Sequence, residues 1–197
     1  MSILWSVENP FSRVNETLRR LRLDSGMVIE DVAYHGDIAR TEIGDLLYPV
    51  QIKRRVIKSI EDGRRTVTVD FLRIYSKVFE MQISDILRKH IGLEPETRKF
   101  MFIEKLLLHE TLGCIRVGRR TTYERLAHEF GCKARYIKRL EDIGNYRYLE
   151  NQIKAYSDYF DIPVWKIFQI SEHTRDLDTK EAMVINYDIR NFIVKGV

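Results

Sequence analysis

Apolar residues recur at steps of three and four along most of the chain, which is the spacing of an amphipathic helix. The clearest examples are Leu18 with Leu21, Val28 with Val32, and the set Phe71, Ile74, Tyr75 and Val78. Glycines interrupt this pattern at positions 26, 36, 44, 63, 92, 131 and 144, and glycine is a common helix terminator. The pattern predicts a compact all-α fold built from short helices.

The sequence also contains an internal repeat. Residues 74–87, IYSKVFEMQISDIL, resemble residues 155–168, AYSDYFDIPVWKIF, and IED at 60–62 matches LED at 140–142. Further upstream EDVA at 30–33 matches ERLA at 124–127, but the offset there is 94 residues instead of 80 or 81. Three matches in the same order indicate two copies of one domain, with an insertion near residues 34–50 of the first copy.

We predict one domain at residues 1–92 and a second at residues 99–170, separated by a polar segment in which Pro95 would break a helix. The tail, residues 171–197, has a different composition. Its residues 183–194 are rich in β-branched and aromatic side chains and partly alternate in polarity, which favours a strand or hairpin. Such a tail would pack on its own domain or pair with another chain.

Composition narrows the class of protein. Of the 197 residues 44% are hydrophobic, and the net charge is +4. The pI is about 9.0, so the protein is mildly basic. The N-terminus does not resemble a signal peptide, no apolar run approaches the roughly 18 residues of a membrane span, and two cysteines do not make a disulfide framework. These features predict a cytoplasmic protein.

The second copy contains a helix-turn-helix pattern at residues 121–142. Thr122 is a suitable N-cap for a first helix that ends at Gly131. Cys132 is small and apolar and fits the turn, and a second helix is expected from about Lys133 to Glu141. The outward face of that second helix carries Lys133, Arg135, Tyr136, Lys138 and Arg139.

The first copy repeats this arrangement less regularly at residues 51–65. An apolar stripe of Ile52, Val56, Ile57 and Ile60 is expected to be buried. Basic residues point away from the stripe or follow Gly63, namely Lys53, Arg54, Arg55, Lys58, Arg64 and Arg65. A helix fits the major groove of DNA, where arginine and lysine pair with guanine or neutralise phosphates. The basic faces of both copies therefore predict contact with double-stranded DNA.

Both copies resemble the phage-repressor, or Xre-type, helix-turn-helix domain, a family with five helices per domain. In copy two the matching residues are Leu126-Ala127, Gly131-Cys132, Ile137, Leu140-Glu141, Gln152 to Tyr156 and Ile162. In copy one they are Leu18 to Arg22, Val32-Ala33, Ile57, Ile60 to Gly63 and Leu72 to Ile86. The resemblance implies two tandem five-helix domains that bind DNA, in a protein of bacterial, plasmid or phage origin.

The chain departs from the family pattern in three places. The insertion after Ala33 separates the first two helices of the motif in copy one. In copy two Ile143 precedes the glycine that follows the recognition helix, and the first helix, expected near Phe102 to Leu108, lies far ahead of Thr122. Whether both copies bind DNA therefore stays open.

Other chemistry is not predicted. His109, Cys114, His128 and Cys132 have a spacing superficially like that of metal ligands, but a zinc site needs four converging side chains. Cys132 is expected in the buried turn and His128 on the surface, so no metal site is predicted. No catalytic motif was found, so neither an enzyme nor a cofactor is predicted. The isolated histidines His35, His90 and His173 are expected on the surface. The aromatic side chains near the end of each copy are expected in the core, namely Tyr75, Phe79, Tyr156, Phe160, Trp165 and Phe168.

The sequence thus predicts a sequence-specific DNA-binding regulator of transcription. Two alternatives remain: a DNA-binding accessory protein of a mobile element, and a protein-interaction module that uses the same fold without DNA. Family analogy and the tail favour a homodimer. Neither a membrane nor a small-molecule substrate is predicted as a partner.

Overall fold

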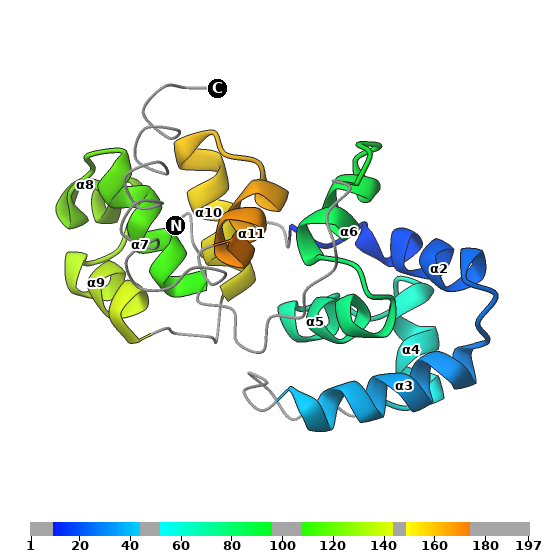
Figure 1. The fold of residues 1–197 in the computed structure, drawn as a ribbon. Helices are drawn as coiled ribbons and strands as arrows, with labels where there is room; N and C mark the ends of the chain where they lie inside the picture. The colour runs from blue at the N-terminus through cyan, green and yellow to red at the C-terminus, as the bar shows by residue number, and fades with distance from the viewer. Residues whose placement is uncertain (1–9, 44–51, 96–107, 144–148, 174–197) are drawn as a thin grey trace. The chain divides into compact units, whose positions relative to one another are not determined.

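The computed structural model describes residues 10–43, 52–95, 108–143 and 149–173, and every regular element within them is an α-helix (Figure 1). The predicted all-α class is therefore confirmed for these residues. The strand or hairpin expected at residues 183–194 lies outside them. None of the described helices is long and apolar enough to cross a membrane.

The described residues fall into two compact units. We call residues 10–95 the N-terminal unit. It contains α2 (Val14–Asp24), α3 (Ile29–Glu42), α4 (Arg54–Glu61), α5 (Val69–Val78) and α6 (Ile83–His90). Helix α3 packs on α4 and α5, and α2 packs on α4 and α6. Their facing apolar side chains form a core that includes Leu18, Ile57, Ile60, Leu72, Ile74, Tyr75 and Ile86.

We call the described residues of 108–173 the C-terminal unit. It contains α7 (Leu108–Gly118), α8 (Tyr123–Glu129), α9 (Ala134–Ile143), α10 (Leu149–Phe160) and α11 (Val164–His173). Helix α9 packs on α7 and α8, and α11 packs on α7 and α10. The core of this unit includes Leu112, Ile115, Leu126, Phe130, Ile137, Ile153, Tyr156 and Phe168.

The two units share local detail as well as helix order. After α5, Glu80 has a φ of 48°, and after α10, Asp161 has a φ of 53°. Non-glycine residues seldom adopt this left-handed conformation. A phenylalanine precedes each of them, and its ring lies against a buried tyrosine. The distance between ring centroids is 5.6 Å for Tyr75–Phe79 and 5.7 Å for Tyr156–Phe160. The internal repeat of the sequence is therefore also a repeat of structure.

Three local expectations need correction. In the second copy α7 (Leu108–Gly118) continues beyond the expected Leu108 and ends three residues before Thr121, while residues 102–107 of the expected helix lie outside the described residues. The long gap expected before the motif is therefore absent. In the first copy, α3 continues to Glu42, so the inserted segment begins as helix and not as a break after Ala33. Residues 171–173, expected in the tail, belong to α11.

Candidate nucleic-acid interface

Helices α8 and α9 are joined by a short turn, as expected for residues 121–142 of the second copy. The hydroxyl of Thr122 accepts a hydrogen bond from the backbone N–H of Arg125 at 3.2 Å, as expected of an N-cap. Gly131 adopts a φ of 62° in the turn, a conformation that glycine reaches without steric cost. Cys132 is half-buried, and burial raises the pKa of its thiol. The turn is tight, and α9 begins at Ala134.

The basic face of α9 is open to solvent. Lys133, Arg135, Lys138 and Arg139 are exposed, and none of them makes an ion pair with a described residue. Tyr136 differs from the outward position expected for it, because it is half-buried. Its hydroxyl oxygen accepts a hydrogen bond from the side-chain amide of Gln152 on α10, at 3.4 Å. This contact ties Tyr136 to α10.

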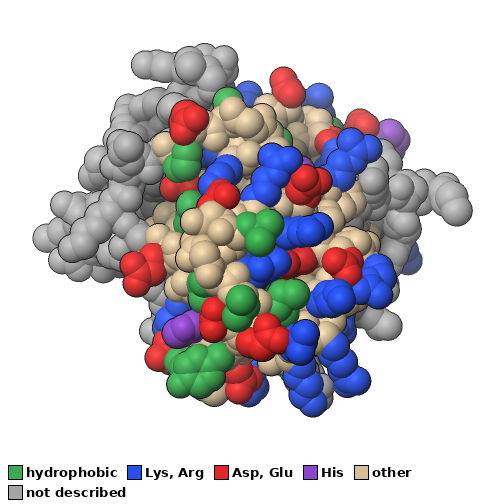
Figure 2. Space-filling view, turned by 90° about the vertical axis from the view of Figure 1, so that its right-hand side faces the viewer, with side chains coloured by type: hydrophobic (Ala, Val, Ile, Leu, Met, Phe, Trp, Pro, Cys, Tyr) green, Lys and Arg blue, Asp and Glu red, His purple; other side chains and the backbone are tan. Residues whose placement is uncertain are grey.

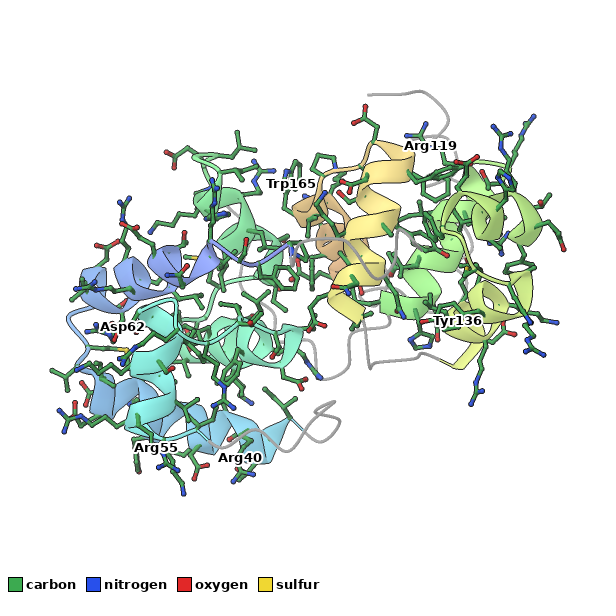
Figure 3. All side chains as sticks on the ribbon, turned by 180° about the vertical axis from the view of Figure 1, so that it is seen from behind. Arg40, Arg55, Asp62, Arg119, Tyr136 and Trp165 are labelled. Atoms are coloured by element: carbon green, nitrogen blue, oxygen red, sulfur yellow. The ribbon has the colours of Figure 1, made fainter. Side chains whose placement is uncertain are left out.

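The basic residues of the first copy lie on and beside α4, and all six are exposed: Lys53, Arg54, Arg55, Lys58, Arg64 and Arg65. Two of them are paired with acidic side chains. Arg54 contacts Glu30 on α3 at 2.8 Å, and Arg64 contacts Asp62. Arg55 and Asp62 lie toward opposite ends of α4 (Figure 3), so the basic residues extend over the whole helix and past its end.

One side of the N-terminal unit is basic but mixed in sign. Figure 2 shows the side of the N-terminal unit that lies at the right in Figure 1, where lysine and arginine side chains gather over much of the face. Acidic side chains lie between them. A surface of this kind attracts a polyanion mainly through the cations that are not already paired.

A buried ion pair between Arg22 and Glu61 holds the C-terminal end of α4. The Arg22 side chain on α2 donates from Nε to both carboxylate oxygens of Glu61, at 2.9 and 3.0 Å, and from Nη2 at 2.8 Å. Its Nη1 donates to the Met27 carbonyl at 3.1 Å, and the Tyr75 hydroxyl donates to Glu61 at 3.4 Å. The hydrogen bond to Glu61 raises the pKa of Arg22, and burial, reinforced by Glu61, raises that of Tyr75.

The C-terminal unit repeats this cluster with different residues. Arg116 on α7 donates from Nε to both oxygens of Glu141, at 2.8 and 3.0 Å, and from Nη2 at 2.7 Å. Its Nη1 donates to the Thr121 carbonyl at 3.0 Å, and the Tyr156 hydroxyl donates to Glu141 at 2.7 Å. Burial alone would lower the pKa of Arg116, but the hydrogen bond and the charge of Glu141 raise it.

The two clusters were not predicted as contacts, although their residues were visible in the repeat. Glu61 and Glu141 belong to the matched IED and LED segments, and Tyr75 and Tyr156 belong to the longest match. Arg22 and Arg116 are 94 residues apart, the same offset as the upstream match. A buried arginine is unusual unless it is paired, so the recurrence of Arg, Glu and Tyr at matched offsets was the available signal.

The histidines and cysteines do not assemble into a site among the described residues, where no group of three or more histidine, cysteine, aspartate or glutamate side chains is placed to hold a metal ion. His109 is buried on α7, whereas the side chain of His128 on α8 is exposed. His35 is exposed as expected. His90 differs from expectation, because it is half-buried with its Nδ1 3.2 Å from the Thr17 hydroxyl.

No protein-family model, curated protein or solved structure matches the chain significantly.

Proposed function

We propose that this protein binds a specific sequence of double-stranded DNA and regulates transcription from it. The observation that carries the proposal is the recurrence of one arrangement in both units. In each, a short helix, α4 or α9, presents exposed basic side chains and is anchored at its end by a buried Arg–Glu pair. The resemblance of both copies to Xre-type domains supports the same conclusion.

The geometry suits recognition in the major groove. An α-helix with its side chains is about 10–12 Å across, and the major groove of B-DNA is about 12 Å wide. Arginine and lysine near the start of such a helix reach base edges, and those further along reach phosphates. On α9 the first group is Lys133 and Arg135, and the second is Lys138 and Arg139.

The buried clusters support this function by holding the basic helices in a fixed orientation. Glu61 and Glu141 lie at or near the C-terminal ends of α4 and α9, and each is bonded to the first helix of its unit. A recognition helix loses less free energy on binding when its side chains and axis are already ordered. The opposite end of each helix is not involved in the cluster and carries exposed cations.

A selection experiment tests the proposal. The full chain is incubated with a library of random duplexes in about 150 mM salt, and bound duplexes are amplified and sequenced over several rounds. We expect one family of related sequences to emerge. Enrichment of no sequence would contradict specific binding. Mapping an enriched sequence onto the genome would separate regulation at promoters from a role in transfer or partition.

A further inference from the structure

The first helix of each unit ends in the same kind of turn. In both, the N–H of one turn residue donates to the carbonyl three residues earlier, and the next N–H donates to the carbonyl five residues earlier. The donors are Arg120 and Thr121 after α7, and Gly26 and Met27 after α2, which lie 94 positions earlier. This pair of bonds defines the Schellman ending of a helix, in which the first donor is left-handed and usually glycine.

Arg120 occupies the position of this turn that favours glycine. Its φ is 53°, and that of Gly26 at the matched position is 68°. Glycine adopts this conformation without steric cost, whereas an L side chain is strained there. Glu80 and Asp161 are also left-handed, but they occupy matched positions of the two units and so belong to the common fold. Strain at Arg120 is specific to the C-terminal unit, and such strain clusters at functional sites.

The neighbouring Arg119 has a buried donor that no described residue satisfies. Its Nε is buried and has no hydrogen-bond partner among the described residues. The matched residue of the N-terminal unit is Ser25, whose hydroxyl donates to the Leu21 carbonyl at 2.8 Å. A buried N–H without an acceptor costs free energy, and it often marks the place of a bound water or ion. The turn after α7 therefore has a donor available for an external acceptor.

Arg116 fixes this turn against the candidate recognition helix. Its Nη1 donates to the Thr121 carbonyl at 3.0 Å, and its Nε and Nη2 donate to Glu141 near the C-terminal end of α9, at 2.8 and 2.7 Å. One buried guanidinium thus holds both segments. Arg119 and Arg120 are therefore kept near the end of α9 whose exposed cations are assigned to phosphates. Arg120 is exposed, and neither arginine makes an ion pair with a described residue.

We propose that Arg119 and Arg120 bind a phosphate of the DNA backbone. The guanidinium group is always charged, and its planar fork of donors matches the oxygens of a phosphate. The matched Ser25 and Gly26 of the N-terminal unit carry no charge, so that unit has no equivalent contact. This inference rests on the proposed function, and it adds to α9 a second DNA-binding element that is gained at the expense of stability.

The test measures binding and stability of the full chain, using the duplex enriched by selection and a scrambled duplex of the same length. Arg120→Gly removes the charge and relieves the strain. We expect it to bind both duplexes about 2- to 5-fold more weakly, with a salt slope lower by about one, because a phosphate contact is independent of sequence. The slowest-exchanging amides of the C-terminal unit should at the same time be about 2- to 5-fold better protected from hydrogen exchange.

Two further variants separate the charge from the fold. Arg119→Met keeps an apolar stem and loses the guanidinium, so it should lower the salt slope by about one without loss of stability. Arg120→Lys keeps both the charge and the strain and should retain the wild-type salt slope. The matched control is Asp161→Gly, which relieves the same strain in the same unit without removing a cation. It should gain stability and keep the wild-type salt slope.

Two results would overturn the inference and leave the proposed function intact. One is a wild-type salt slope in both Arg120→Gly and Arg119→Met, which would show that neither arginine contacts a phosphate. The other is a loss of stability in Arg120→Gly, which would give this side chain a structural role. Failure of the wild-type chain to bind either duplex would instead contradict the proposed function itself.

Discussion

The buried carboxylates Glu61 and Glu141 show how single residues set the geometry of each unit. Each accepts three hydrogen bonds from one guanidinium and one from a tyrosine hydroxyl. A buried charge of this kind is tolerated only while its partners remain. The pairs therefore contribute less to net stability than to holding α2 against α4 and α7 against α9.

Removal of one partner tests this account. Glu61→Ala leaves Arg22 buried without its counter-charge, and we expect it to destabilise the N-terminal unit by about 3–5 kcal/mol. Native-state hydrogen exchange of the α5 amides measures the change in that unit alone. Glu16→Ala, which breaks the exposed pair with Arg20, is the control and should cost below about 1 kcal/mol. Similar losses from the two substitutions would contradict the assigned role.

We expect His90 to make the N-terminal unit sensitive to acid. Burial, together with the nearby charge of Arg13, lowers the pKa of His90 in the folded state. Between the lowered pKa and the ordinary value of about 6.5, the unfolded chain binds more protons than the folded one, so stability falls as pH falls. We expect His90→Gln to reduce this loss between pH 7 and pH 5, as followed by hydrogen exchange. An unchanged pH dependence in the variant would show that His90 is not responsible.

At the scale of elements, α8, α9 and the turn between them were predictable because their signals are local. The Thr122 cap and the Gly131 turn place α8 and α9 within a few residues of their observed bounds. The extended α3 was not predictable in the same way. Gly36 was interpreted as a helix terminator, but it lies inside α3 and its lack of a side chain allows close packing on Ile52. That role depends on tertiary contact, which no local pattern reveals.

Gly36 therefore provides a test of how α3 and α4 are joined. Gly36→Ala should gain about 1 kcal/mol of helix propensity, but the added Cβ would clash with Ile52 at a cost of about 1–3 kcal/mol. We expect net destabilisation of the N-terminal unit. Adding Ile52→Ala removes the clashing methyl group, so the double variant should be more stable than the sum of the two single effects predicts. Strict additivity in a denaturation series would contradict the close contact.

The placement of α7 illustrates a different limit of sequence analysis. Apolar residues are dense from Phe102 to Ile115, and the first helix of the second copy was expected near Phe102 to Leu108. The structure places it at residues 108–118. In this helix Arg116 pairs with Glu141, and Leu112 and Ile115 enter the core. The ion pair joins residues that are far apart in the sequence, so the hydrophobic pattern alone does not reveal it.

At the scale of the whole molecule, the repeat is the feature that links sequence, structure and function. Its offsets of 80 and 94 residues correctly matched Glu61 with Glu141 and revealed the insertion, and both units contain the same order of helices. The basic residues on and beside α4 and α9 were correctly predicted to be exposed, whereas Tyr136, expected on the same outward face, is half-buried. The contact with duplex DNA remains the proposal that unites these observations.

The most direct test of that proposal is to measure the affinity of the full chain for the enriched duplex and for a scrambled duplex. Fluorescence anisotropy at two salt concentrations gives both affinities. The account predicts that the enriched duplex binds at least about 1000-fold more tightly, and that both affinities fall steeply as salt rises, because bound cations release counterions from phosphates. Equal and weak binding to both duplexes, or no binding, would contradict the account and favour a function in binding another protein.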